Sequence, residues 1–148
     1  MTNEEYMKIA IEEAEKAASE EEVPVGAIVV FKGDIIAKTR NECEGRQDPT
    51  AHAEVLAIQK AAKHLGNWRL SGCRLYVTKE PCPMCAGAIF QARVDELIYG
   101  VSDIKAGAAG TLYNITNDVR LNHQTSVTSG VCEEECRKLL QDFFKKRR

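Results

Sequence analysis

The pattern of hydrophobic and polar positions along this chain predicts helices that alternate with strands. Thr2 and Glu5 form a capping box, and the apolar residues behind them recur at helical spacing, which predicts a first helix with one buried side. Val23 to Phe31 is typical of a strand, and Ile35 to about Arg40 is typical of its partner across a turn at Gly33-Asp34. We therefore expect an antiparallel hairpin behind the first helix.

The remainder of the chain continues this alternation. A helix is predicted from the start signal Asp48-Pro49-Thr50 to about Leu65, where Gly66-Asn67 ends it. Alternating helices and strands favour parallel pairing with helices on both faces of the sheet, so the predicted fold class is α/β. The later predicted elements are a strand over Leu75–Thr78, a helix that ends near Ala92, a strand over Val94–Gly100 and a helix from about Cys132 to Arg148.

Length and composition set the outer bounds. The 148 residues fit one domain, residues 1–148, which is long enough to bury a core without disulfides. The sequence has no secretory leader pattern and no apolar run near the roughly 18 residues needed to cross a bilayer. We therefore expect a soluble, cytoplasmic protein with no membrane partner, whose six cysteines are reduced thiols or metal ligands.

Charge is unevenly distributed along the chain. The net charge of −2 argues against indiscriminate nucleic-acid binding, but residues 1–22 hold eight acidic and two basic side chains, so the remainder is mildly basic. The chain ends in Phe143-Phe144-Lys145-Lys146-Arg147-Arg148, which is suited to base stacking and phosphate contact. A solvated helix end whose cations complement the helix dipole explains these residues equally well.

Two short motifs carry the candidate chemistry. His52-Ala53-Glu54 is followed by Pro81-Cys82-Pro83-Met84-Cys85, which supplies three metal ligands and one carboxylate. A structural zinc is closed by four protein ligands, whereas a catalytic zinc keeps one position for water and needs a proton carrier nearby. The set of His52, Cys82 and Cys85, with Glu54 as the carrier, therefore predicts one catalytic Zn²⁺ per chain.

The spacing of these residues predicts how they converge. Cys82 and Cys85 share one side of a helix that Pro83 can start. Asp48 or Thr50 is the candidate cap of the earlier helix, which would place His52 in its first turn. We expect two helix N-termini directed at one metal ion, where the helix dipole favours thiolates.

Other metal and redox sites fit less well. A lone Cys-x-x-Cys is compatible with a redox pair or with half of a zinc ribbon. A ribbon needs a second ligand pair, and none is formed by the remaining candidates, which are Cys43, Cys73, His64, His123, Cys132 and Cys136. Cys132 and Cys136 are better explained as core residues of a helix. The redox interpretation has no use for His52-Ala53-Glu54.

The combination of H-x-E with P-C-x-x-C is the signature of zinc nucleobase deaminases. Hydrolytic loss of an amino group needs a hydroxide at neutral pH, and zinc lowers the pKa of water to about 7 in favourable sites. It also needs protons at the ring nitrogen and at the departing ammonia. Glu54 can take the proton of the water and transfer it to these atoms.

Several further segments extend the likeness over nearly the whole chain, which resembles the bacterial tRNA adenosine deaminases of the cytidine deaminase superfamily. The segments are Val23-Pro24-Val25-Gly26-Ala27, Asp48-Pro49-Thr50-Ala51-His52-Ala53-Glu54, Asn67-Trp68-Arg69-Leu70, Leu75-Tyr76-Val77-Thr78, Cys85-Ala86-Gly87-Ala88, Asn122-His123 and Phe143-Phe144. The resemblance implies a three-layer α/β/α cytidine-deaminase-like fold with a five-stranded mixed sheet, a homodimer, and conversion of the wobble adenosine of tRNA-Arg to inosine.

The resemblance also implies substrate contacts. Asn41 occupies the place of an Asn that helps to hold the flipped base, although a turn-forming Asn at a strand end is an ordinary feature. Ala53 and Cys82 correspond to backbone amides that orient the attacking water. Asp103 and Lys105 resemble positions along bound RNA, and both could equally be solvated loop charges. Phe143 and Phe144 complete the expected substrate-binding set.

Two departures from the family weaken the substrate assignment. Lys79 stands where the family usually carries an apolar residue, so its stem must be buried while its amine reaches solvent, or the packing behind the cysteine helix must differ. The segment Glu42-Cys43-Glu44-Gly45 is also atypical. The leading hypothesis is a zinc-dependent tRNA adenosine deaminase. Its alternatives are a deaminase of free cytosine, guanine or cytidine, and a noncatalytic zinc-stabilised RNA-binding module.

Overall fold

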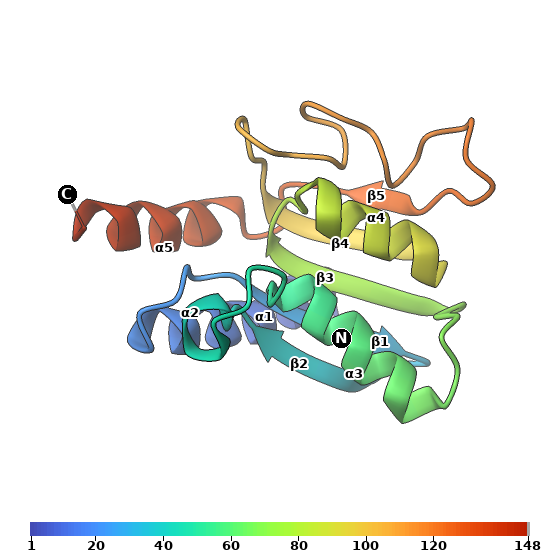
Figure 1. Ribbon diagram of the computed structural model, residues 1–148, viewed down its shortest axis with the longest axis horizontal. Helices are drawn as coiled ribbons and strands as arrows, with labels where there is room; N and C mark the ends of the chain where they lie inside the picture. The colour runs from blue at the N-terminus through green and yellow to red at the C-terminus, as the bar shows by residue number, and fades with distance from the viewer. Residues whose placement is uncertain (148) are drawn as a thin grey trace.

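The computed structural model, described over residues 1–147, has five strands in one mixed sheet (Figure 1). The strand order is β2-β1-β3-β4-β5. β1 pairs antiparallel with both β2 and β3, whereas β3, β4 and β5 pair in parallel. The elements are α1 (Asn3–Ser19), β1 (Gly26–Phe31), β2 (Asp34–Arg40), α2 (Cys43–Arg46), α3 (Ala53–Leu65), β3 (Cys73–Lys79), α4 (Pro83–Ala92), β4 (Glu96–Val101), β5 (Ser126–Thr128) and α5 (Glu133–Lys145).

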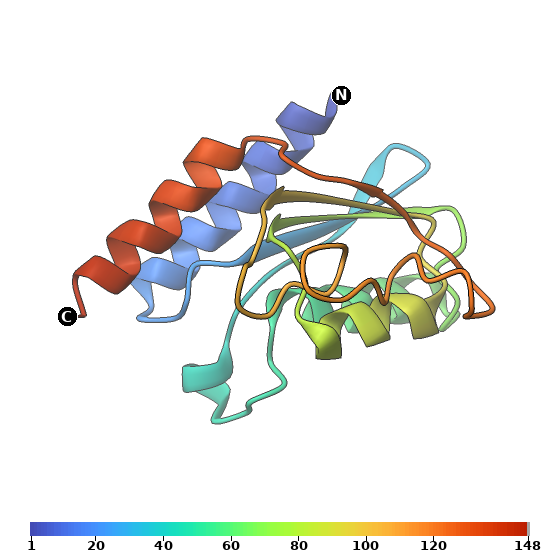
Figure 2. The same ribbon diagram turned by 90° about the horizontal axis from the view of Figure 1, so that it is seen from above.

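The helices cover both faces of the sheet. Figure 2 shows α1 and α5 side by side on one face and α3 and α4 on the other, which confirms the predicted three layers. Alternation along the central strand β3 supplies both cores, because Leu75 and Val77 pack toward α3 and α4 while Tyr76 packs toward α1. Gly26 is required where β1 crosses α1, since a Cβ there would lie 2.0 Å from the carbonyl oxygen of Ala10.

The predicted hairpin and the capping box are confirmed. The Thr2 hydroxyl accepts from the Glu5 N–H and the Glu5 carboxylate accepts from the Thr2 N–H, at 3.1 and 3.2 Å. The first strand begins at Gly26 rather than at Val23, and the turn is centred on Lys32-Gly33. The hydrophobic pattern did not predict α2 or β5, because one has four residues and the other three, too few to show a period.

The last helix is shorter than predicted. It covers Glu133–Lys145, and Cys132 adopts a left-handed conformation with φ of 55° just before it. Cys136 is buried against β4, as expected for a core residue, whereas Cys132 is half-buried. The predicted end at Arg148 lies outside the described residues.

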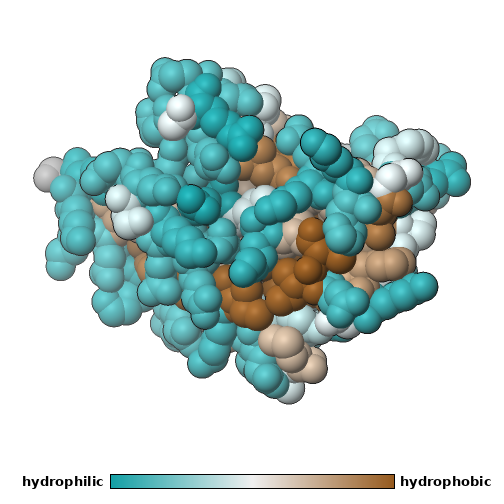
Figure 3. Space-filling model, turned by 90° about the horizontal axis from the view of Figure 1, so that it is seen from below, coloured by the Kyte–Doolittle hydropathy of each residue, from teal (hydrophilic) through white to brown (hydrophobic). Residues whose placement is uncertain are grey.

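One side of the molecule is largely hydrophilic (Figure 3). Figure 3 shows hydrophilic residues over most of one side, with an apolar band across the middle. The edge strand β2 lies toward this side in Figure 1, and its Ile35 and Ile36 are half-buried. Within residues 1–147, no helix combines the length and the apolar character needed to span a bilayer.

Strand direction brings three chain segments to one edge of the sheet. β2 runs antiparallel to β1, which runs antiparallel to β3, so β2, β3 and β4 all point the same way. The residues that follow their carboxyl ends are therefore neighbours. These are Asn41 after β2, Glu80 after β3 and Asp103 shortly after β4. In open α/β sheets, ligands bind at this kind of edge.

Candidate active site

The start of α3 places His52 and Glu54 beside each other. His52 is the N-cap residue of α3, with extended backbone angles and no side-chain cap hydrogen bond. The prediction that Asp48 or Thr50 caps this helix is wrong, because Oδ1 of Asp48 accepts from the Thr50 N–H and hydroxyl in a local turn, at 2.8 and 2.7 Å. The His52 imidazole therefore lies off the end of the helix rather than in its first turn.

The start of α4 presents the two thiols. Cys82 is the N-cap residue, Pro83 begins the helix, and Cys85 is in the first turn. This confirms the predicted role of Pro83, whose fixed φ favours the first helical position. Both metal-ligand motifs therefore place a ligand at an N-cap position that is not used for side-chain capping. Two helix N-termini point to the same space.

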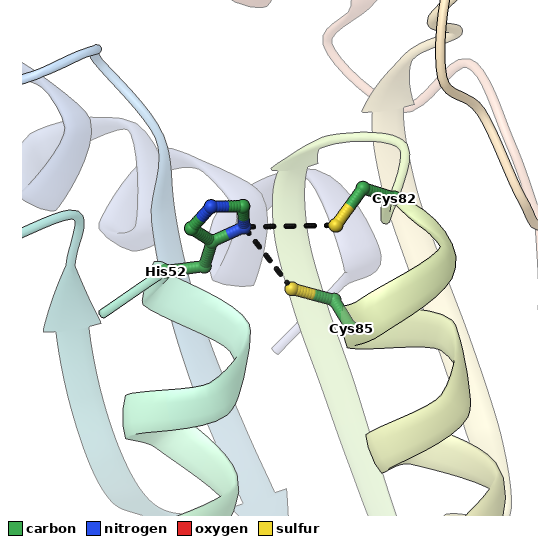
Figure 4. A group of neighbouring side chains, drawn as sticks. All are labelled: His52, Cys82 and Cys85. Carbon is green, nitrogen blue, oxygen red and sulfur yellow. Dashed lines mark hydrogen bonds between the residues drawn. The ribbon is translucent and has the colours of Figure 1, made fainter. Parts of the chain in front are cut away.

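The three side chains converge as the motif predicts (Figure 4). His52 Nδ1 lies 3.6 Å from Cys82 Sγ and 3.4 Å from Cys85 Sγ. All three ligand atoms lie within 4.8 Å of one another. A tetrahedral metal ion with a nitrogen ligand at about 2.05 Å and a sulfur ligand at about 2.3 Å separates the two ligand atoms by about 3.5 Å. The observed spacing and donor types therefore fit a metal ion.

The ligand count distinguishes this site from a zinc ribbon. Across residues 1–147, this is the one cluster of three or more side chains able to hold a metal. Cys43 and Cys73 are free thiols, as are Cys132 and Cys136. Because three protein ligands leave one tetrahedral position for solvent or substrate, the arrangement is that of a catalytic site.

Glu54 is the acid beside this cluster. Its side chain belongs to the first turn of α3 and is buried, with 4% of the residue exposed. Burial raises the pKa of Glu54 to about 7, and its own backbone N–H and the charge of His52 oppose that rise. A carboxyl group that exchanges protons near neutral pH is suited to general acid–base chemistry.

The thiol pair has unequal acidity. A hydrogen bond from Cys85 lowers the pKa of Cys82 to about 4, against the effect of burial, and His52 lowers it further. Cys82 is therefore the thiolate of the pair when both compete for one proton. Thiolates are the form of cysteine that binds metals.

A cavity of about 230 Å³ opens above the cluster. It is smaller than the roughly 300–1,000 Å³ typical of sites for drug-sized ligands, which suits a single base. His52, Glu54 and Cys82 form its floor. Its walls come from the segment before β1, the residue after β2, the start of α2, the end of β3 with the residue after it, the loop after β4, and α5. The wall residues are Val23, Val25, Asn41, Cys43, Lys79, Glu80, Asp103 and Phe144.

Asn41 belongs to this cavity but already makes one firm contact. Its Oδ1 accepts from the Ala53 N–H at 2.7 Å, and the residue is 8% exposed. Asn41 thus supplies the cap of α3 from a neighbouring strand. The Ala53 N–H was expected to orient the attacking water. In the structure it donates a hydrogen bond to Asn41 instead, so it is not free for that role. The amide N–H groups of Asn41 remain available to a ligand.

Of the two aromatic residues expected to stack on a base, only one is exposed to the cavity. Phe144 lines the cavity and is 45% exposed. Phe143 is buried, with the Arg147 guanidinium 3.4 Å from its ring centre and the Phe144 ring against it at 5.3 Å. The expectation for Phe143 is corrected accordingly, because its side chain lies on the inner side of an amphipathic helix.

The cations at the end of the chain are not all free. Arg147 forms an ion pair with Glu21, in addition to its contact with Phe143. Lys145 and Lys146 are exposed. Arg147 is therefore explained by contacts within the protein, as expected for a cation at a helix end. Lys145 and Lys146 are the exposed cations that remain compatible with the expected phosphate contact. Arg148 lies outside the described residues.

Asp103 and Lys105 lie where the carboxyl end of β4 reaches the site. Asp103 Oδ2 pairs with Lys79 Nζ at 3.2 Å, and its Oδ1 accepts the Lys105 N–H at 2.9 Å. Lys105 is exposed and lines a wider groove of about 1,140 Å³ between this loop and α5. The Lys79 side chain lines the cavity and is 30% exposed, and its amine contacts Asp103.

Sequence reasoning missed Glu80. Its buried carboxylate accepts the N–H groups of Asp103, Ala109 and Thr111, at 3.0, 3.0 and 3.1 Å, and the Thr111 hydroxyl. Glu80 thereby fixes the glycine-rich loop 103–111 against the turn that carries Cys82. Gly107 is required there, because a Cβ would lie 2.4 Å from Glu80 Oε1. The signal in the sequence was a Glu directly before a metal-ligand motif.

Comparison with known proteins identifies the family. Residues 1–148 match the MafB19-like deaminase family. A protein of Bacillus subtilis named tRNA-specific adenosine deaminase is 52% identical over 149 residues, which cover 100% of this chain and 92% of that protein. The chain belongs to the tRNA-specific adenosine deaminase family. Because the members of this family are hydrolytic deaminases, this protein is a hydrolytic enzyme, as its two motifs predicted.

Solved structures agree with the fold of this deaminase. A structure from a study of A-to-I editing by tRNA:A34 deaminases at the wobble position of transfer RNA has a TM-score of 0.88 and 41% identity, covering 92% of this chain and 99% of that chain. A guanine deaminase from Bacillus subtilis has a TM-score of 0.68 and 42% identity, covering 75% of this chain and 71% of that chain. The predicted cytidine-deaminase-like fold with its five-stranded mixed sheet is confirmed.

Proposed function

We propose that this deaminase converts the wobble adenosine of tRNA-Arg to inosine, with one Zn²⁺ per chain held by His52, Cys82 and Cys85. The observation that carries the proposal is a three-ligand cluster with a buried carboxyl group beside it, at the floor of a base-sized cavity. The relatives named for tRNA adenosine deamination support the choice of substrate.

The donor set favours zinc. One imidazole and two thiolates suit a borderline-soft ion that accepts tetrahedral geometry. When bound, zinc supplies the Lewis acidity that makes water deprotonation feasible near neutral pH. His52 and Cys82 fix their ligand atoms from N-cap positions, and Cys85 fixes its own from the first turn of α4.

Glu54 is the proposed proton carrier. It accepts the proton of the attacking water and donates protons to the purine ring nitrogen and to the leaving amino group. Because Glu54 is buried, bulk water does not compete for its proton. Its pKa near 7 allows it both to accept the proton of the water and to donate a proton to the base. Glu54 lines the cavity floor beside the ligands His52 and Cys82.

Substrate contacts are proposed for the walls. Asn41 holds the base through its free amide N–H groups, with Ala53 fixing the orientation of Asn41. Phe144 stacks on the target base or a neighbouring base, and Phe143 supports Phe144 from beneath. Asp103 and Lys105 lie along the RNA, toward the wider groove. We further propose one domain over residues 1–148, a homodimer and a cytoplasmic location.

The second candidate function is deamination of a free purine, which the similarity to a guanine deaminase favours. The test offers zinc-loaded protein an anticodon hairpin of tRNA-Arg, free adenosine, cytosine, cytidine and guanine in parallel. The proposal predicts inosine and ammonia from the hairpin alone, and no product from a hairpin with guanosine at the wobble position. Ammonia from guanine or cytosine, with an unchanged hairpin, would overturn it.

A further inference from the structure

Lys79 stands between the base-sized cavity and the wider groove. It lines both spaces, as do Asp103 and Phe144. The two spaces therefore meet at these three side chains. This junction leads from the base-sized cavity into a groove with room for the sugar and phosphate of a strand.

The position of Lys79 is fixed by its surroundings. It ends β3, where it pairs with Val101 of β4, and the next residue, Glu80, donates its N–H to the Val101 carbonyl oxygen at 2.9 Å. The side chain is 30% exposed. A cation held by a sheet and a short turn loses less conformational entropy on binding than a lysine in a free loop.

Asp103 holds the ammonium group without using up its hydrogen bonds. Asp103 Oδ2 lies 3.2 Å from Lys79 Nζ, while Asp103 Oδ1 is occupied by the N–H groups of Lys105 and Ala106. A lysine ammonium has three N–H donors, so two remain for another acceptor. The pair thus holds at the junction a cation that keeps donors for a further acceptor.

The groove around Lys79 is suited to phosphate. Lys79, Lys105, Arg137 and Arg147 contribute cationic groups to it, and Asp103 is its one acidic side chain among the described residues. Arg137 is paired with Glu133 and Glu134, and Arg147 is paired with Glu21. Of these four cations, Lys79 alone also lines the cavity. Its one acidic partner, Asp103, leaves two of its N–H donors free.

We propose that Lys79 binds the phosphodiester that flanks the target nucleotide, and so makes this deaminase select a base within an RNA strand over the same free base or nucleoside. The inference rests on the proposed function. A lysine acts as a compact point charge on a phosphate oxygen. A free base or nucleoside carries no phosphate and gains nothing from this contact.

The test is the salt dependence of binding, measured by fluorescence anisotropy with a labelled tRNA-Arg anticodon hairpin. Lys79→Met keeps the length of the stem and removes the charge. We expect about tenfold weaker binding at low salt and a log–log salt slope smaller by about 0.7–1, which corresponds to one lost phosphate contact. Lys60→Met, on α3 and lining a different cavity, is the matched control and keeps the wild-type slope.

Asp103→Asn separates phosphate binding from a purely structural ion pair. If Lys79 binds phosphate, Asp103→Asn keeps the full salt slope, because the cation remains. If Lys79 serves only to neutralise Asp103, both variants lower the melting temperature alike and neither changes the slope, which overturns the inference. Zinc content and melting temperature of each variant show whether a change is local.

Adenosine 5′- and 3′-monophosphate carry the two phosphates that flank a nucleoside in a strand, so they test the contact without the rest of the RNA. The inference predicts that one of them competes with the hairpin better than adenosine does, and that this advantage is lost in Lys79→Met. If neither nucleotide competes better than adenosine with the wild-type protein, or if the advantage persists in Lys79→Met, the inference is overturned. Failure of the wild-type protein to bind or deaminate the hairpin would remove the proposed function as well, whereas deamination with an unchanged slope in Lys79→Met would remove the Lys79 inference alone.

Discussion

The floor and the outer wall of the cavity are built in different ways. The floor consists of His52, Glu54 and Cys82, with Cys85 directly behind them, and all four come from two short motifs at the starts of α3 and α4. The outer wall is assembled from the end of β3, the loop after β4, and α5, which are far apart in the sequence. The comparison indicates that chemistry is fixed by local sequence, whereas recognition depends on how distant segments meet.

This difference has a physical basis. The start of a helix fixes the direction of its first residues. Once the sheet places α3 and α4 side by side, two motifs are therefore enough to bring four side chains together. The outer wall has no such local rule. Lys79 faces Asp103 only because β3 and β4 pair in parallel, and Phe144 reaches the same space only because α5 lies across the sheet.

Replacing Glu54 tests the floor most severely. Glu54→Ala removes the proton carrier but none of the metal ligands, so we expect kcat to fall by about 10²–10⁴-fold with zinc content unchanged. Turnover is measured as inosine formation, and zinc by elemental analysis. A noncatalytic RNA-binding module would bind the hairpin and melt as before, with no turnover in either protein. That result would contradict the enzyme assignment.

Removing the metal tests whether the floor depends on it for stability. Binding to the folded state alone stabilises a protein by about 4 kcal/mol when the free ligand is at 1,000 times Kd. We expect a chelator to lower the melting temperature of the wild-type protein, and zinc to restore it. His52→Ala should melt at one temperature with or without zinc. If zinc raised the melting temperatures of the wild-type protein and of His52→Ala equally, the metal would bind at another site.

Two adjacent phenylalanines sharpen the comparison on the outer wall. Phe144→Ala should weaken hairpin binding by about 5- to 150-fold, the equivalent of roughly 1–3 kcal/mol of base stacking, with little change in melting temperature. Phe143→Ala should instead lower the free energy of unfolding by about 3 kcal/mol, because that ring is buried. Anisotropy and denaturant titration measure the two effects. If Phe143→Ala weakened binding and Phe144→Ala lowered stability, Phe143 would be the stacking residue and Phe144 the core residue.

Asn41 connects the two regions, and its replacement should destabilise the protein less than that of Phe143. Asn41→Ala removes the acceptor of the Ala53 N–H and should cost about 1 kcal/mol, as for other helix caps. Asn41→Asp keeps an acceptor, and should keep stability, but it loses the amide donors proposed to hold the base. We therefore expect KM to rise in both variants. An unchanged KM in Asn41→Asp would limit Asn41 to capping.

The sequence predicted the floor well and the wall only in part. The side chains of His52, Cys82 and Cys85 converge as predicted, with Glu54 beside them, because each motif is contiguous. The cap of α3 was assigned wrongly, because Asn41 approaches from β2 and no local pattern reveals it. Phe143 was expected to contact the substrate together with Phe144, but it lies on the buried side of α5 and only Phe144 lines the cavity. Glu80 was missed because its place directly before the cysteine motif does not reveal that its carboxylate is buried and accepts hydrogen bonds from a distant loop.

The central claim is an open metal site with three protein ligands. X-ray absorption at the zinc edge of the loaded protein tests it directly. We predict two sulfur ligands at about 2.3 Å, with the remaining nitrogen and oxygen ligands at about 2.0–2.1 Å. The spectrum should be unchanged in Cys43→Ser, which alters the other cysteine of the cavity. A third sulfur ligand, or no stoichiometric zinc, would contradict the account.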